Sequence, residues 1–331
     1  MEPSKRSLLR AGSRLVVAAV GVPALAMFGM RASAQDQGSP ITITVAFAAG
    51  ASTDGLARIL AEGLAKRLGR PVIVANKPGA FGTVAAKSVQ RAPADGLNLL
   101  LASSTTFAIA PNLYKSADFD PLKDFTTIAS LATGQNVLAI NPDVPANTIQ
   151  EFISLARANP GKFSYGSNSG TSLVASEMFK TLARVDIVGV PYKDVGTQMN
   201  DVIGGRISMV ILDQLNATPL VRAGKLRGLA VAGAQRSSLL PNLPTLDESG
   251  LNGFRINSWI GLAGPAGMPK AVVERLNTAT NQVVSSPEYA SKLVAFGYDP
   301  IIHTPDQATA LVAEELKRWS SMIAATGIKK E

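Results

Sequence analysis

The amino-acid sequence predicts an α/β fold of two lobes, each a doubly wound sheet covered by helices. The first observation is a regular alternation of short apolar strands with amphipathic helices, which is typical of parallel sheets. The second is size, because 331 residues with 46% hydrophobic composition suffice for two separate cores. The third is that no flexible linker interrupts the alternation, so the chain is expected to cross between the lobes more than once.

The first lobe begins with strand and helix in alternation. Apolar runs predict strands over 41–47, 71–75 and 97–102. Apolar residues at helical spacing predict a helix over 54–68, and small residues predict a second helix over 84–90. This order predicts a parallel sheet at the start of the mature chain.

The same rhythm continues to the end of the chain. Further strands are predicted over 136–141, 162–167, 185–193, 206–213, 226–232 and 256–267. Further helices are predicted over 149–158, 172–182, 197–203, 269–285, 287–296 and 305–325.

The first 34 residues have the pattern of a secretory signal peptide. A basic stretch containing Lys5 and Arg14 precedes an apolar segment over 15–30, and Ala32-Ser33-Ala34 fits a cleavage site. We therefore expect cleavage after Ala34 and a periplasmic mature protein. The alternative, a membrane anchor, is disfavoured because the apolar segment is shorter than the about 20 residues that a spanning helix needs.

Charge, cysteine and histidine content narrow the function classes. Five basic residues and one acidic residue precede position 35, so the rest of the chain has a net charge of about +4 against +8 for the whole. It holds no basic run typical of nucleic-acid binding, and we expect no nucleic-acid partner. The absence of cysteine excludes thiolate metal sites, and the single histidine, His303, disfavours histidine-based catalysis. We expect no metal and no cofactor.

No catalytic motif appears at the turns where enzymes carry one. The first turn, 48–51, has one glycine where dinucleotide binding needs three, and no phosphate-binding loop with its lysine follows. The segment Gly166 to Gly170 resembles a nucleophile elbow but has Asn168 in the nucleophile position. We therefore expect no catalytic residues.

Polar or glycine-containing turns instead follow several predicted strands. They are residues 48–53, 78–83, 103–106 and 167–172, together with Asp213. Ligands of open α/β sheets bind at the carboxyl ends of strands, and helix N-termini there attract anions without any basic side chain. For any one of these turns, ordinary N-capping of the following helix is a sufficient explanation. Several such turns in one chain favour a carboxylate-binding cleft.

Seven segments, in order, resemble a known receptor family over residues 41–331. They are similar to the extracytoplasmic substrate-binding proteins of tripartite tricarboxylate transporters, the Bug-type receptors. The segments are FAAGASTDGLAR, RPVIVANKPGAFG, APADGLNLLLAS, VPYKDVGTQMNDVIGGRI, AGKLRGLAVAG, LPTLDESGLNGF and WIGLAGPAGMPKAVVERLN.

The resemblance implies a type II periplasmic-binding-protein fold with crossing strands and a ligand cleft between the domains. Domain 1 would combine residues 35–136 with 258–331, and domain 2 would comprise 137–257. The ligand would be a small organic acid, held through one carboxylate by backbone amides, hydroxyls and waters. The partners would be that carboxylate and integral-membrane transporter subunits, and we expect a monomer.

The predicted ligand-binding residues combine the polar turns with four aromatic side chains. They are Phe47, Ala49, Gly50, Ser52, Asp54, Gly79, Phe81, Ser104, Thr106, Ser167, Ser169, Thr171, Tyr192, Asp213 and Trp259.

Two positions depart from the family pattern and bear on the ligand. Ala51 replaces a glycine that the family often has, so the first loop must avoid positive φ there. Phe81 replaces a glycine of the second loop. It either packs on its own lobe or lines the cleft for an aromatic or branched acid. In the second case Phe81→Gly would weaken binding by roughly 1–3 kcal/mol.

Three functions fit these observations to different degrees. The leading hypothesis is a receptor that captures a small carboxylate and delivers it to a membrane transporter. A periplasmic sensor that presents its ligand-bound form to a signalling receptor is an alternative. A secreted hydrolase or isomerase is a weaker one, because no nucleophile and base are paired in the sequence.

Overall fold

The computed structural model describes residues 38–330 and contains a mixed sheet with helices on its faces. Its strands are β1 (Ile41–Val45), β2 (Val72–Asn76), β3 (Asn98–Ser103), β4 (Phe125–Ile140), β5 (Ser164–Ser167), β6 (Val188–Pro191), β7 (Met209–Asp213), β8 (Arg227–Val231), β9 (Asn257–Pro265) and β10 (Tyr298–Pro300). The signal peptide predicted over 1–34 lies outside the described residues.

The helices follow the strands in alternation. They are α1 (Ser52–Leu68), α2 (Thr83–Gln90), α3 (Ala110–Leu113), α4 (Ile149–Ala158), α5 (Gly170–Ala183), α6 (Val195–Ile203), α7 (Gln214–Arg222), α8 (Lys270–Val284), α9 (Pro287–Ala295) and α10 (Pro305–Thr326). A short 3₁₀ turn, η1 (Ala80–Gly82), precedes α2, and a π-helical segment, η2 (Ser104–Ile109), follows β3. Within the described part of the chain no helix is long and apolar enough to span a bilayer.

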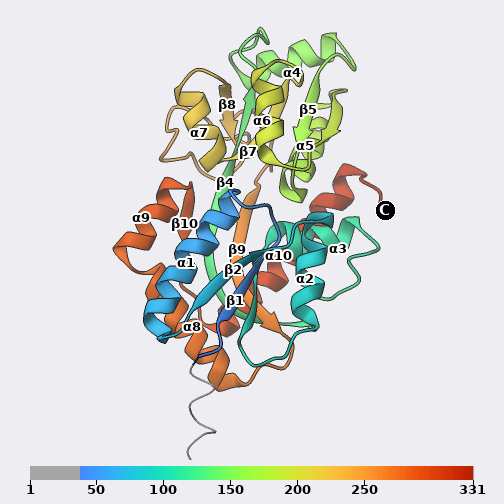
Figure 1. The fold of residues 1–331 in the computed structure, drawn as a ribbon. Helices are drawn as coiled ribbons and strands as arrows, with labels where there is room; N and C mark the ends of the chain where they lie inside the picture. The colour runs from blue at the N-terminus through green and yellow to red at the C-terminus, as the bar shows by residue number, and fades with distance from the viewer. Residues whose placement is uncertain (1–37, 331) are drawn as a thin grey trace, which may run out of the picture. The chain divides into compact units, whose positions relative to one another are not determined.

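Two long strands connect the two halves of the sheet. The strand order is β2-β1-β3-β9-β4-β7-β5-β6, with β10 paired to the middle of β4 and β8 paired to its last residues. The first part of β4, to Gln135, pairs with β9, and the second part, from Asn136, pairs with β7 and β8. Figure 1 shows β4 and β9 running between the two groups of strands. The fold class expected from the resemblance is confirmed.

Strand direction differs from the sequence prediction at the centre of the sheet. Strands β1, β2 and β3 are parallel as predicted, and so are β5, β6 and β7. Strands β4 and β9 are antiparallel to each other and to the strands beside them. A segment that carries the chain from one half to the other and a segment that returns it must run in opposite directions.

Separate apolar clusters support each half. Leu56, Leu60 and Leu64 of α1 pack with Val283 of α8 beside β1 and β3. Helices α4 and α5 pack their apolar faces beside β5 and β7. The end of α10 joins that second cluster through buried Trp319, so the last helix contacts α5 (Figure 1).

Several elements were missing from the sequence prediction, among them the short segments η1 and α3. The first half of β4, the segments η2 and α7, and strand β10 all lie in stretches without clear apolar periodicity. Helix α7 even contains Pro219. Tertiary pairing with β9 and β4 defines the strands among them, and this pairing leaves no local signal.

Candidate functional site

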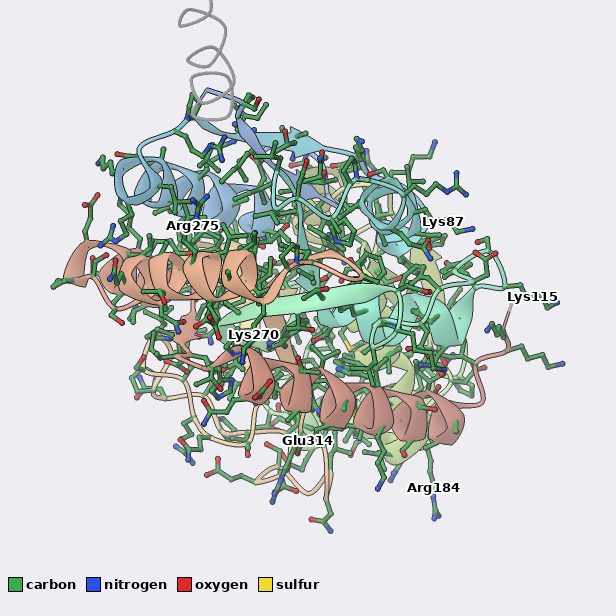
Figure 2. The ribbon with its side chains drawn as sticks, turned by 90° about the horizontal axis from the view of Figure 1, so that it is seen from below. Lys87, Lys115, Arg184, Lys270, Arg275 and Glu314 are labelled. Carbon is green, nitrogen blue, oxygen red and sulfur yellow. The ribbon has the colours of Figure 1, made fainter. Side chains whose placement is uncertain are left out.

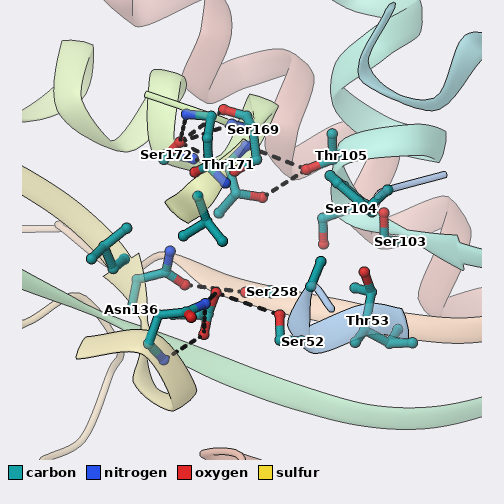
Figure 3. Close-up of a pocket in the computed structure, with 18 of the residues that line it drawn as sticks. Ser52, Thr53, Ser103, Ser104, Thr105, Asn136, Ser169, Thr171, Ser172 and Ser258 are labelled. Atoms are coloured by element: carbon teal, nitrogen blue, oxygen red, sulfur yellow. Dashed lines mark hydrogen bonds between the residues drawn. The ribbon is translucent and has the colours of Figure 1, made fainter. Parts of the chain in front are cut away.

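A polar pocket lies where the strand ends of both halves meet the starts of α1, α5, α7 and η2. Its empty volume, including the part open to solvent, is about 630 Å³. The lining residues are Phe47, Ala51, Ser52, Thr53, Ser103, Ser104, Thr105, Asn136, Asn168, Ser169, Thr171, Ser172, Val195, Ile211, Leu212, Asp213, Asn216, Ser258, Trp259, Ile260 and Tyr298. Figure 3 shows Ser169, Thr171 and Thr105 on one side and Ser52, Asn136 and Ser258 on the other.

Helix α1 opens into this pocket without a side-chain cap. Its N-cap residue is Ala51, which has an extended backbone with φ −68° and no side-chain hydrogen bond. The alanine therefore avoids positive φ, as the sequence predicted. The hydroxyl of Thr53, in the first turn, is buried and has no hydrogen-bond partner in the described structure. Helix N-termini present unpaired N–H groups and partial positive charge, so this end of α1 can receive an anion.

Asp54 holds the loop before α1 in place. Its carboxylate accepts hydrogen bonds from the Gly50 N–H at 3.0 Å and from Asn76 Nδ2 at 2.9 Å, and it pairs with Arg58 at 3.0 Å. Burial opposes ionisation of this group, but the bonds from Arg58, Gly50 and Asn76 outweigh it and lower the Asp54 pKa below 3.8. Asp54 thus positions the loop from behind rather than lining the pocket.

The segments η2 and α5 contribute hydroxyl groups to one wall. The hydroxyls of Thr105 and Thr171 lie 3.2 Å apart. Ser104 Oγ accepts the Trp259 N–H at 2.8 Å and faces the buried carboxylate of Glu315 at 3.5 Å. These bonds join three segments that are distant in the sequence.

The helices that share this wall cap themselves. Ser103 Oγ accepts the Thr106 N–H at the start of η2. Ser169 and Ser172 form a reciprocal capping box at the start of α5. Two more helices that begin at the pocket are also capped by side chains, α6 by Asp194 and α7 by Asp213. Helix α1 has no such cap.

Asp213 lies at the opposite wall, at the end of β7. Asn216 donates to both of its oxygens, at 3.0 and 2.9 Å, and Ser52 Oγ donates at 3.4 Å. Burial raises the pKa of Asp213, and these hydrogen bonds offset that rise only in part. Burial and the nearby Asp213 raise the pKa of Tyr298, so its phenol stays protonated.

Seven predicted ligand-binding residues line the pocket together, although they come from five separate segments of the chain. They are Phe47, Ser52, Ser104, Ser169, Thr171, Asp213 and Trp259.

The other predicted residues lie outside the lining. They are Ala49, Gly50, Asp54, Gly79, Phe81, Thr106, Ser167 and Tyr192. Phe81 packs edge-on against Tyr114, with ring centroids 5.3 Å apart. The Tyr192 hydroxyl donates to Asp201 at 2.8 Å, and Thr106 lies 3.2 Å from the Ser103 hydroxyl. Each of these side chains is occupied by a contact within its own region of the fold.

The pocket also includes residues that the sequence analysis did not select. Thr53, Ser103, Thr105 and Ser172 belong to turns that the analysis had marked, so their signal was present at the level of the turn. Tyr298 had no signal, because only the pairing of β10 with β4 brings it to the site. Its ring packs where a side chain at Gly134 would clash, at 2.5 Å.

Basic side chains are absent from the lining residues that the structure describes. Figure 2 shows Lys115 and Arg184 extending outward from the ribbon. The ring of His303 contacts the buried Ser130 hydroxyl at 3.1 Å instead of the pocket. Residues 38–330 contain no group of three or more metal-ligating side chains. An anion here would be bound by neutral groups and helix N-termini.

Comparison with known proteins gives a family match over most of the chain. The model of the tripartite tricarboxylate transporter family receptor matches residues 56–328. A curated relative, protein BugT of Bordetella pertussis, is 31% identical over 293 residues, which are 88% of this chain and 90% of the relative.

Two solved structures with bound acids have the same fold. Rpa4515 of R. palustris with adipate has a TM-score of 0.84 at 32% identity and covers 88% of this chain and 98% of its own. MatC of Rhodopseudomonas palustris with bound malate has a TM-score of 0.80 at 30% identity and covers 86% and 98%. Both ligands are dicarboxylates.

Proposed function

We propose that this chain, which belongs to the tripartite tricarboxylate transporter family of receptors, binds a small dicarboxylate in the polar pocket and delivers it to a membrane transporter. The relatives are solute-binding receptors. The structures of Rpa4515 with adipate and MatC with malate support a dicarboxylate as the ligand. We propose no enzymatic activity, since the described lining offers hydroxyls without a histidine or lysine beside them.

The observation that carries the proposal is the open N-terminus of α1. Ala51 cannot cap the helix, whereas Ser169, Asp194 and Asp213 cap α5, α6 and α7, which also begin at lining residues. A ligand carboxylate placed at Ala51–Thr53 would accept the first N–H groups of α1 and the unpartnered Thr53 hydroxyl. It would supply the cap that the sequence lacks.

Neutral donors around this point suit a carboxylate. The hydroxyls of Ser104, Thr105 and Thr171 lie across the pocket from Ser52, as Figure 3 shows. Such groups bind an anion through directed hydrogen bonds, and solvent salt screens them less than it screens surface charges.

We further propose that the two halves close over the ligand. Domain 1 would comprise 35–136 with 258–331, and domain 2 would comprise 137–257. The change of partners in β4 after Gln135 and the start of β9 at Asn257 support these boundaries. The bond from Ser52 to Asp213, which joins the two halves at 3.4 Å, would form only in the closed state, and this would couple ligand affinity to closure.

Export to the periplasm completes the proposal. Binding proteins of this family are periplasmic, and the signal peptide predicted over 1–34 would direct this chain there. The protein would act as a monomer and pass its ligand to integral-membrane subunits.

Thermal unfolding with and without acids tests the proposal. Purified protein, unfolded and refolded to remove carried-over ligand, is heated with dicarboxylates, tricarboxylates and amino acids. A ligand at one hundred times its dissociation constant stabilises by about 2.7 kcal/mol, which shifts the midpoint by several degrees. No shift with any acid would contradict the proposal.

The variant Ala51→Asp tests the position of the carboxylate. Its side chain would cap α1 itself, which is worth about 0.5–2 kcal/mol, and would occupy the place of the ligand. We expect an unchanged or raised midpoint without ligand and a loss of the ligand-induced shift. The control Ala266→Asp adds the same charge at an exposed turn and should bind normally. Normal binding by Ala51→Asp would place the carboxylate elsewhere.

A further inference from the structure

Asp213 is the one charged side chain among the described residues that line the pocket. An acid is unexpected in a site for anions, since its charge repels them. Within residues 38–330 it also has no cationic partner: its hydrogen bonds come from the amide of Asn216 and the hydroxyl of Ser52. The titratable group that interacts with Asp213 is the phenol of Tyr298, which also lines the pocket.

Capping of α7 does not explain why this residue is an acid. The cap uses Oδ1, which accepts the Asn216 N–H at 3.1 Å. Asparagine caps helices about as well as aspartate does. The second oxygen, Oδ2, receives Asn216 Nδ2 at 2.9 Å and the Ser52 hydroxyl at 3.4 Å. A hydroxyl bond of that length is beyond the usual range, so Oδ2 retains capacity for a better donor.

The pocket therefore offers several hydrogen-bond donors and one charged acceptor. The N–H groups at the start of α1, and the hydroxyl pair of Thr105 and Thr171 on the facing wall, can donate hydrogen bonds. Asp213, in its ionised form, can only accept them. A ligand that fits both kinds of group carries a carboxylate for the donors and a donor of its own for the wall at Asp213.

We propose that Asp213 selects acids that bear a hydroxyl or ammonium group, and disfavours acids that lack such a donor. This inference rests on the proposed function, because it assigns the ligand class of the same site. A hydroxyl or an ammonium on the carbon skeleton donates to Asp213 Oδ2 and strengthens or replaces the weak bond from Ser52. An unsubstituted diacid brings only like charge to this wall.

Calorimetric titration with matched acids tests the inference. The purified protein expressed from the full sequence is titrated with succinate, malate and aspartate, and with adipate, 2-hydroxyadipate and 2-aminoadipate. We expect a substituted acid of the preferred length to bind at least tenfold more tightly than its unsubstituted counterpart. The hydroxy and amino arms identify which donor the site prefers.

The variant Asp213→Asn assigns the selectivity to this side chain. It keeps the cap of α7 and should reduce the ratio between substituted and unsubstituted acid to within about twofold, with tighter binding of the unsubstituted acid. The control Asp143→Asn removes an exposed acid and should keep the wild-type ratio. Should Asp213→Asn fail to fold, Asp213→Ser offers a second neutral cap.

The outcomes separate this inference from the proposed function. Equal wild-type affinities for substituted and unsubstituted acids, or an unchanged ratio in a folded Asp213 variant, would overturn the inference alone. Absence of binding by every acid would overturn the proposed function and the inference together.

Discussion

The hydroxyl oxygens of Thr105 and Thr171 lie 3.2 Å apart, although the two residues are 66 positions apart in the chain. Thr105 belongs to η2, which follows β3, and Thr171 belongs to the first turn of α5, which follows β5. Thr105 Oγ1 also accepts the Thr171 N–H at 3.4 Å. This pair joins the two halves of the sheet at the wall of the pocket.

Replacing Thr105 with valine tests this connection. Valine keeps the shape but leaves the Thr171 hydroxyl and N–H without their partner, which costs about 1–3 kcal/mol in a buried site. We expect a lower free energy of unfolding and about fivefold weaker binding of the acid, measured by urea unfolding and calorimetry. Thr105→Ser keeps the hydroxyl and should stay near wild type. Equal affinity of Thr105→Val and wild type would show that this wall does not contact the ligand.

Asp54 gives a prediction with a defined pH dependence. Its pKa is lowered in the folded state, so its ionised form stabilises the fold above its ordinary value of 3.8, and this contribution is lost as pH falls through the lowered value. Asp54→Asn should destabilise the protein by about 1–2 kcal/mol at pH 7. The difference from wild type should shrink in acid.

Urea unfolding at pH 7 and at pH 3 checks this expectation, with Asp143→Asn as the exposed control. The variant should also bind its acid more weakly, because Asp54 fixes the Gly50 N–H in the loop before α1. A stability difference that grows in acid would contradict the assigned role of the carboxylate.

The sequence predicted most of the fold because local signals and tertiary structure agree there. Periodic apolar residues define α1 and β3, and the turn after each strand is marked by small polar residues. The first half of β4 escaped because its burial on both faces replaces alternation with a mixture of small and hydroxyl residues. Antiparallel pairing with β9 required knowledge of the other half of the sheet.

The site was predicted at the level of turns and less well at the level of residues. The sequence analysis selected Ser104 and Thr106 from the polar turn 103–106. In the structure η2 begins within this turn, and Thr105 lines the pocket in place of Thr106. A serine or threonine that caps a helix cannot be distinguished in the sequence from one that binds a ligand. Only the structure shows that Ser169 is engaged with Ser172 while Ala51 leaves α1 uncapped.

Phe81 gives a prediction that separates its two interpretations. It packs against Tyr114 and does not line the pocket, so Phe81→Ala should lower the free energy of unfolding by about 1–3 kcal/mol. Affinity for the acid should stay within about twofold of wild type in calorimetry. Phe81→Leu retains apolar volume and should lose less stability. A folded variant with much weaker binding would favour the cleft-lining interpretation.

Asp213 gives the opposite sign of pH dependence from Asp54. Burial raises its folded pKa above the ordinary 3.8, so the folded protein binds this proton more strongly than the unfolded chain does. Protonated Asp213 therefore contributes to the free energy of unfolding at low pH. This contribution is lost as pH rises from 3.8 through the raised pKa, and it is absent at neutral pH.

Asp213→Asn should for this reason be more stable than wild type at pH 7 in the absence of ligand, and its advantage should shrink towards pH 4. Chemical unfolding of both proteins at the two pH values measures the difference between their free energies of unfolding. Because the other titratable groups are the same in both proteins, their pH dependence cancels in this difference. A less stable variant at pH 7 would mean that the bonds from Asn216 and Ser52 outweigh the burial of the charge. A more stable variant that has lost its preference among acids would show that the carboxylate is kept for binding, at the expense of the fold.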